Sequence, residues 1–170
     1  AVHGDPSGVS AQRARLPAAV RCRDAVAGVW RGHSFNGRRY NWHVFTLRIE
    51  RESDALRGAI TVRTWDGGPS QQRPPARCEG DLDYSVRMEA AGEIRGEEIT
   101  FGARGAARVT SARCPTPHFS YDPDHFSGSI DATRQEFESV NNDGGTSIND
   151  PVLFRRVACL PGDELTPDAP

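Results

Sequence analysis

Apolar and polar residues alternate along most of the chain, as in β-strands that bury one face. In the second such segment, Phe45, Leu47 and Ile49 share one face, whereas Trp42 and Val44 share the other. The same pattern predicts nine strands, near residues 26–35, 39–50, 56–66, 82–89, 93–102, 106–113, 125–131, 134–140 and 152–158. Helical periodicity is weak throughout, so the sequence predicts an all-β fold.

A short pattern recurs three times in these segments: an apolar residue, Gly two positions later, and then Ile. The copies are Leu56-Arg-Gly58-Ala-Ile60, Ile94-Arg-Gly96-Glu-Glu-Ile99 and Phe126-Ser-Gly128-Ser-Ile130. Each follows a turn-like stretch, at residues 52–54, 91–92 and 122–124, so the repeated unit is a hairpin with a strand glycine that marks a bend. Chance similarity of β-rich segments is the alternative. Successive curling hairpins favour an antiparallel meander closed into an eight- or nine-stranded barrel, because closure removes exposed strand edges.

The predicted strands lie in one central domain, residues 22–159. Residues 1–21 and 160–170 are rich in small, polar and proline residues, and we expect a flexible N-terminal arm and a flexible C-terminal tail. A length of 170 residues suits a single domain. No stretch approaches 18 consecutive apolar residues, so no membrane span is predicted.

Charge is distributed unevenly along the chain. All 21 basic residues are arginine, which favours a GC-rich, bacterial genome as the source of the bias. The net charge of −2 argues against a nucleic-acid partner. Residues 115–154 contain seven acidic residues and one arginine, a net charge of −6, and we expect this segment to form the functional rim.

Four widely spaced cysteines, Cys22, Cys78, Cys114 and Cys159, form an even set. Together with the absence of an initiator methionine, they favour a processed, secreted or periplasmic protein with two disulfides. The spacing contains no Cys-x-x-Cys and does not indicate zinc. Four buried thiols in a trimmed chain are the alternative.

The first predicted strand opens with Gly28-Val29-Trp30, and the last ends with Phe154-Arg155-Arg156. This arrangement resembles the calycins, which include lipocalins and avidins and carry a Gly-x-Trp on strand one beneath a late-strand arginine. The resemblance implies that Trp30 plugs the closed end of a barrel and stacks against Arg155 or Arg156. It implies an architecture and no ligand, because the aromatic box of a biotin site is not visible around Trp42 and Trp65.

An up-and-down barrel of this kind, with an even strand count, brings the start of its first strand beside the end of its last. Cys22 lies just before the first strand and Cys159 just after the last, so we expect these two to pair. Cys78 and Cys114 then pair by exclusion. This second pair fits less readily, because the loop at residues 67–81 must cross the barrel for the two cysteines to meet.

One loop has the composition of a cation site. Its oxygen donors, spaced around two glycines, are Asn141, Asp143, Asn149 and Asp150. Calcium takes six to eight such hard ligands, so calcium is the one metal considered, although no cofactor is the leading expectation. A plain hairpin turn is the favoured alternative, since Asn-Asp-Gly-Gly suits positive φ and Arg155 and Arg156 supply countercharge.

Aromatic and basic residues near strand ends indicate a ligand-binding mouth. The expected ligand-binding set is Phe35, Arg38, Tyr40, Trp42, Trp65, His118 and Tyr121, with Arg39 and Phe119 beside it. Barrel mouths hold small, partly apolar ligands. Ordinary core packing of these rings is the alternative.

The leading functional prediction is a secreted barrel that binds a small molecule or a glycan at its mouth, without catalysis. The second is a protein–protein interaction module that docks through its acidic 115–154 side. The third is a small secreted enzyme, with His118 or His125 and Asp122 or Asp124 as acid and base. His33 and His43 are further candidates, although exposed or core histidines are the simpler interpretation.

Overall fold

The computed structural model describes residues 4–78, 82–114, 120–145 and 148–165. Within these residues it contains one short helix and nine strands: α1 (Val9–Arg15), β1 (Gly28–Asn36), β2 (Asn41–Glu52), β3 (Ala55–Asp66), β4 (Asp83–Arg95), β5 (Glu98–Ala103), β6 (Arg108–Ala112), β7 (His125–Asp131), β8 (Glu136–Asn142) and β9 (Ile148–Ala158). The all-β prediction is confirmed. Among the described residues, no helix has the length and hydropathy needed to cross a membrane.

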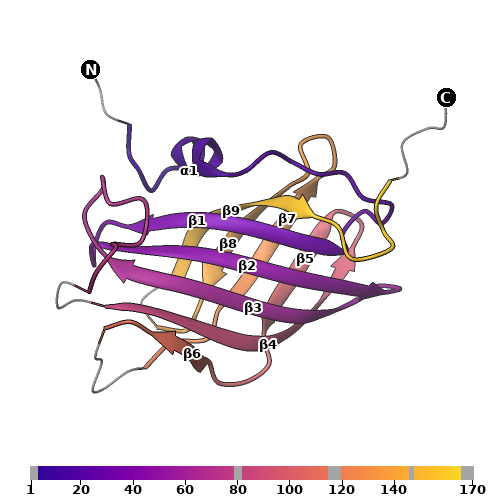
Figure 1. Cartoon of the computed structure of the whole chain (residues 1–170). Coiled ribbons are helices and arrows are strands. Elements are labelled where there is room, and N and C mark those ends of the chain that lie inside the picture. The colour runs from indigo at the N-terminus through magenta and orange to yellow at the C-terminus, as the bar shows by residue number, and fades with distance from the viewer. Residues whose placement is uncertain (1–3, 79–81, 115–119, 146–147, 166–170) are drawn as a thin grey trace.

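Eight strands close into an antiparallel barrel (Figure 1). Strands β1 to β5 pair in chain order, β7, β8 and β9 continue the sheet, and β9 returns to pair with β1. The interior is packed with apolar side chains, and the rings of Phe126 and Phe154 meet edge to face with centroids 4.8 Å apart. Burial of each such large side chain stabilises the fold by roughly 1.5–3 kcal/mol.

Strand β6 lies outside this eight-stranded circuit. It pairs with β4 at residues 84–87, next to the stretch of β4 that pairs with β5. Among the described strands, β6 pairs with β4 alone. The sheet is therefore not hydrogen-bonded from β6 to β7 beside residues 84–87 of β4. Residues 120–124 lie there, and the Asp124 carbonyl accepts a hydrogen bond from the Ala103 N–H at 2.9 Å.

The strand glycines have two roles. At Gly58 and Gly128 the backbones pass so closely that a Cβ would overlap the carbonyl oxygen of the neighbouring strand. The turn expected at Ala91-Gly92 is wrong: β4 runs through both residues, and a Cβ at Gly92 would meet the Thr100 carbonyl. The chain turns instead at Gly96, whose φ of +62° is the left-handed conformation that glycine favours.

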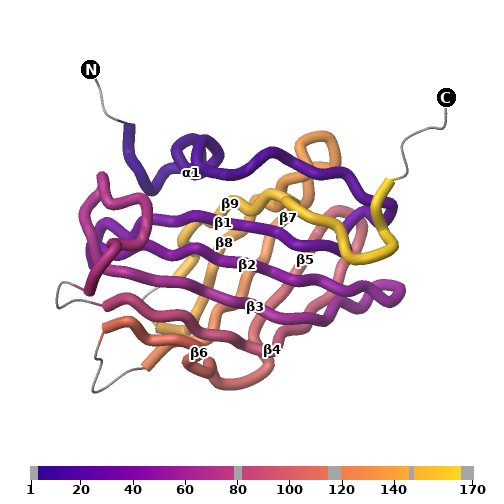
Figure 2. Tube along the Cα trace, viewed as in Figure 1, coloured from indigo at the N-terminus to yellow at the C-terminus, as the bar shows by residue number. Residues whose placement is uncertain are grey.

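The chain before β1 runs along the outside of the barrel, as the tube in Figure 2 shows. There α1 packs against β1 and β9, in a segment for which the sequence favours a flexible arm. Gln12 is fully buried: its Nε2 donates to the Pro151 carbonyl, and its Oε1 accepts from the Leu153 N–H, both at 2.9 Å. The pairing of β1 with β9 ends at Phe154. Beyond that point, the Gln12 amide makes the hydrogen bonds to β9 that a neighbouring strand would otherwise make. The limits of the domain at residues 22 and 159 stay predictions.

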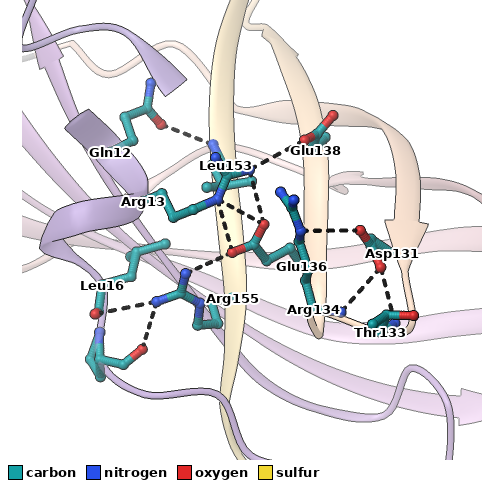
Figure 3. Close-up of polar contacts among 11 residues, drawn as sticks. Gln12, Arg13, Leu16, Asp131, Thr133, Arg134, Glu136, Glu138, Leu153 and Arg155 are labelled. Carbon is teal, nitrogen blue, oxygen red and sulfur yellow. Dashed lines mark hydrogen bonds and ion pairs between the residues drawn. The ribbon is translucent and has the colours of Figure 1, made fainter. Parts of the chain in front are cut away.

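An ion-pair cluster fastens α1 to the barrel (Figure 3). The Glu136 carboxylate is only 1% exposed and accepts from Arg155 Nη2 at 2.7 Å and from Arg13 Nε at 3.1 Å. A buried carboxylate needs such partners, because desolvation costs several kcal/mol. Arg155 therefore binds Glu136 on the outer face of the barrel.

Arg156, the next residue of β9, points into the barrel and contacts Trp30, which closes one end of it. We call this end, where β1 begins, the closed end. The Arg156 guanidinium lies over the Trp30 ring at 5.4 Å and donates to the Ala27 carbonyl at 2.9 Å. Trp30 is 1% exposed, and a Cβ at Gly28 would crowd the Arg156 side chain. The tryptophan–arginine contact is the one that the calycin resemblance implies.

Both predicted cysteine pairs are confirmed. Cys22 and Cys159 join residues 137 apart in sequence at the closed end, and Cys78 pairs with Cys114. Cys78 comes close to Cys114 because the loop after β3 folds back over the barrel. There Arg113 Nη2 donates to the Ala76 carbonyl at 2.6 Å.

Candidate functional site

The interior of the barrel changes from apolar to polar along β2. Phe45, Leu47 and Ile49 face inward at the core, and the same alternation carries His43 and Asn41 to the inner face nearer the β1–β2 turn. We call this the open end. His43 lies opposite Ser34 of β1 and Thr64 of β3. A polar layer therefore covers the hydrophobic core at this end.

A cavity of about 340 Å³ lies above this layer. Its wall includes inward residues of β1, β2, β4, β8 and β9 together with the segment at residues 120–124. The lining includes Ser34, Phe35, Arg38, Arg39, Asn41, His43, Phe45, Tyr84, Tyr121, Asp122, Asp124, Asn141, Asp143, Asp150, Pro151 and Val152. The volume is at the lower end of the range typical of small-molecule sites.

Asp124 is the most deeply buried acid of the cavity, with 2% exposure. Its Oδ2 accepts from the Tyr121 hydroxyl at 2.6 Å, and its Oδ1 accepts from Asn141 Nδ2 at 2.8 Å. Burial raises the pKa of this carboxyl to about 7, the neighbouring Asp143 and Asp122 add to the rise, and the two hydrogen bonds oppose it. Asp124 therefore titrates near neutral pH.

His43 faces the cavity from the other wall. Its ring stacks on Phe45 with centroids 5.6 Å apart. Burial lowers the pKa of His43 to about 4, although the Asp143 carboxylate works in the opposite direction. The imidazole is therefore neutral at pH 7 and offers the cavity one donor and one acceptor.

Two tyrosine hydroxyls complete the polar lining. Burial raises the pKa of both Tyr84 and Tyr121, and the negative charge of Asp124 raises each further. Both hydroxyls consequently stay protonated at neutral pH. Tyr84 lies opposite Thr64 on β3 and places an aromatic ring beside the His43 layer.

Arginines occur at the rim of the cavity. Arg38 Nη2 lies 3.6 Å from Asp150 Oδ1, but the Arg38 side chain is 80% exposed. An exposed pair of this kind contributes little to stability. Arg39 is also exposed. The basic groups are thus in solvent, whereas the carboxylates of Asp124 and Asp143 are inside or at the wall.

The predicted ligand-binding residues separate into two groups. Arg38 and Tyr121 lie at the cavity wall. Phe35 borders the cavity, but its ring packs on the outer face with its centroid 4.7 Å from that of Trp42. Tyr40 does not line it and is 58% exposed. His118 and Phe119 lie outside the described residues.

Trp42 and Trp65 lie on the outer face of the barrel, contrary to the prediction that they line its mouth. Both are 0% exposed, and their indole nitrogens donate to the carbonyls of Gly68 and Gln71, each at 2.9 Å. The reason is register: Trp42 is one residue from His43, so strand alternation sends it outward. The loop after β3 then covers both rings.

Three of the four predicted calcium ligands make hydrogen bonds or ion pairs with other protein groups. Asn141 uses Nδ2 on Asp124 and Oδ1 on the His125 N–H at 3.1 Å. Asp143 Oδ1 accepts from the Gly145 N–H at 2.8 Å, as in a turn, and Asp150 faces Arg38. Asn149 is exposed with φ +59°. Within the described ranges, no group of three or more His, Cys, Asp or Glu side chains is placed to hold a metal.

The other histidine candidates do not reach the cavity. His125 is exposed on β7, beside the inward-facing Phe126. His33 lies on the outer face, with its ring centroid 5.2 Å from that of Trp42. His125 therefore does not join Asp122 and Asp124, which line the cavity. The pairs expected with His118 lie outside the described residues.

Sequence reasoning missed Ser34, Asn41 and Tyr84. A signal for Asn41 was present, since it continues the inward stripe of β2 by four residues from Phe45. Comparison of the chain with protein-family models, curated proteins and solved structures finds no match. The likeness to calycins therefore consists of the eight-stranded barrel and the Trp30–Arg156 contact.

Proposed function

We propose that the protein binds a small polar molecule, or one sugar residue of a glycan, in the cavity at the open end. The observation that carries this proposal is the polar layer itself. His43, Asp124 and Tyr84 are held inside a barrel wall where apolar side chains would give a better-packed core. Several polar side chains gathered around one cavity inside a barrel are typical of a binding site.

One polar atom of the wall adds direct support. Asn41 Oδ1 is buried and accepts no hydrogen bond from the residues that the structure describes. Leaving such an acceptor unsatisfied costs about 1–3 kcal/mol, so a ligand that donates to it gains free energy. The strands that carry these groups are rigid elements, which keeps the ordering cost of binding small.

Secretion or export to the periplasm belongs to the same proposal. The two disulfides support it, because such bonds persist in oxidising compartments. Mass spectrometry of non-reduced protein purified from its native source tests it. We expect both Cys22–Cys159 and Cys78–Cys114 peptides, and four free thiols would contradict export.

A thermal-shift screen against a library of metabolites and simple sugars tests ligand binding. Ser34→Phe places a ring in the cavity, and Ser127→Phe places the same ring on the exposed outer face of β7. A ligand at 100 times its Kd stabilises the folded state by about 2.7 kcal/mol. Hits should therefore raise the Tm of the parent and of Ser127→Phe, but not of Ser34→Phe.

Two results would contradict the proposal. One is a screen in which no compound stabilises the parent protein. The other is a set of hits that stabilise Ser34→Phe as well as Ser127→Phe. Tryptophan fluorescence is unsuitable as the readout, because Trp30, Trp42 and Trp65 all lie outside the cavity.

A further inference from the structure

We propose that the ligand of this cavity is a small organic cation that carries a protonated amine next to an apolar or aromatic group. This inference rests on the proposed function, which it deepens by naming the class of ligand. Its support is the placement of charge, aromatic rings and an unsatisfied acceptor in one cavity.

The acidic groups of the cavity differ in depth: Asp124 is buried, Asp143 and Asp150 are half-buried, and Asp122 is exposed. Four aspartates line it, Asp122, Asp124, Asp143 and Asp150, against the two arginines of the rim. Arg38 is largely in solvent and already faces Asp150. An anion that entered past the rim would meet the half-buried Asp143 and then the buried Asp124, and charges interact more strongly at a buried site than in water. A cation is attracted by the same groups.

Aromatic rings line the same space. Phe45 and Tyr84 face inward from β2 and β4, and Tyr121 comes from the segment before β7. A cation is attracted to the face of an aromatic ring, and more strongly as water is excluded. Rings combined with carboxylates favour an ammonium group attached to an apolar body over a strongly hydrated metal ion.

The hydrogen-bonding capacity of the wall fits an ammonium group. An ammonium has three N–H donors and no acceptor. Asn41 Oδ1 is buried, has no donor among the described residues, and belongs to a residue that lines the cavity. It is an independent indication that the missing partner is a hydrogen-bond donor.

Protonation of Asp124 couples binding to pH. The titratable groups around it are Tyr84, Tyr121, Asp122 and Asp143, and both tyrosines stay neutral. Its pKa of about 7 means that the carboxyl is partly protonated at neutral pH. A bound cation favours the carboxylate, so binding releases a proton and affinity rises from about pH 6 to about pH 8.

Three aromatic probes of similar size and different charge test the inference: benzylamine, benzyl alcohol and benzoate. Isothermal titration with the full chain measures their dissociation constants. We expect benzylamine to bind at least about tenfold more tightly than benzyl alcohol, and benzoate to bind most weakly. Benzylamine stays protonated across the pH range of the experiment, so the rise in affinity with pH reports Asp124.

Two isosteric variants locate the charge effect. Asp143→Asn should weaken benzylamine binding by about three- to tenfold and leave benzyl alcohol unchanged. Asp131→Asn is the matched control, because Asp131 also accepts a hydrogen bond from the N–H two residues ahead, at the other end of β8. It should change affinity by no more than about twofold. Asp124→Asn should remove the pH dependence.

The outcomes separate this inference from the proposed function. Equal or tighter binding of benzyl alcohol or benzoate, or equal effects of Asp143→Asn and Asp131→Asn, overturns the cation assignment. Failure of all three probes to bind at millimolar concentration also overturns it. The proposed function still stands in each case if hits of the thermal screen are lost in Ser34→Phe, and it falls if they are not.

Discussion

The two ends of the barrel use buried polar groups in opposite ways. At the closed end, Arg156 is 1% exposed, yet it donates to Gln135 and to the Asp24 and Ala27 carbonyls and covers Trp30. At the open end, Asn41 Oδ1 has no partner in the described part of the chain, and the pKa of Asp124 is raised to about 7.

This difference indicates where stability and function reside. Polar groups at the closed end are satisfied by the protein itself and fasten the first strand to the last. At the open end, the buried acceptor Asn41 Oδ1 has no partner among the described residues. Function is expected where local stability is given up in this way.

The largest expected effect is at the plug. Trp30→Ala should reduce the free energy of unfolding by roughly 3–5 kcal/mol, the usual result of truncating a buried aromatic side chain. Chemical denaturation measures it. Tyr40→Ala, at an exposed residue of the open end, should change stability by less than about 0.5 kcal/mol. Similar losses in the two variants would remove the distinction between the ends.

The disulfides test the same comparison by a different route. Replacing Cys22 and Cys159 with serine should cost about 3 kcal/mol, because their bond closes a loop between residues 137 apart in sequence. Replacing Cys78 and Cys114 should cost about 1 kcal/mol less, since their separation is 36 residues. Denaturant midpoints of the two double variants provide the measurement. A larger loss for the shorter loop would contradict the ordering.

Gln12 links α1 to the wall of the open end, through the β9 residues next to Val152. Gln12→Ala leaves the Pro151 carbonyl and the Leu153 N–H without their partner and should cost about 2 kcal/mol. Hydrogen exchange should then accelerate at Leu153 and not at Trp30. Ser10→Ala, at an exposed residue of α1, is the control and should change neither quantity.

The smallest effect is the pH dependence of stability. Asp124 has a folded pKa of about 7 against an ordinary 3.8, so its contribution to stability falls as pH rises through that interval. His43 has a folded pKa of about 4 against 6.5, so its contribution falls as pH decreases. Relative to the parent, Asp124→Asn should gain about 1–2 kcal/mol between pH 6 and pH 8.

The matching variant at His43 has the opposite sign. His43→Gln should gain stability relative to the parent as pH falls from about 6.5 to about 4. In the parent, the unfolded state binds a proton at His43 in this range and the folded state does not, whereas glutamine does not titrate. Thermal denaturation across the pH range measures both variants. Parallel pH profiles for parent and variants would show that neither group is buried as described.

The sequence predicted the architecture well, for physical reasons. Strand alternation and the Gly-x-Trp motif depend on local pattern, so the barrel and the Trp30–Arg156 contact followed from them. The turn at Gly92 failed because a glycine required for close strand contact has the same local appearance as a turn glycine. Only the register of β4 against β5 separates the two cases.

The candidate site was less predictable. Trp42 and Trp65 were expected at the mouth because they lie near strand ends, but one step of register directs them outward. Burial raises the pKa of Asp124, and hydrogen bonds from Tyr121 and Asn141 hold its carboxyl in place. These are tertiary contacts that no sequence spacing encodes.

The central claim is that the open end, and no other surface, receives the ligand. Two-dimensional NMR of the labelled protein, titrated with the compound that gives the largest thermal shift, tests it most directly. We predict shifts of the Asn41, His43 and Tyr84 amides, with the Trp30 indole N–H unchanged. Shifts centred on Trp30, or on the outer-face indoles of Trp42 and Trp65, would contradict the account.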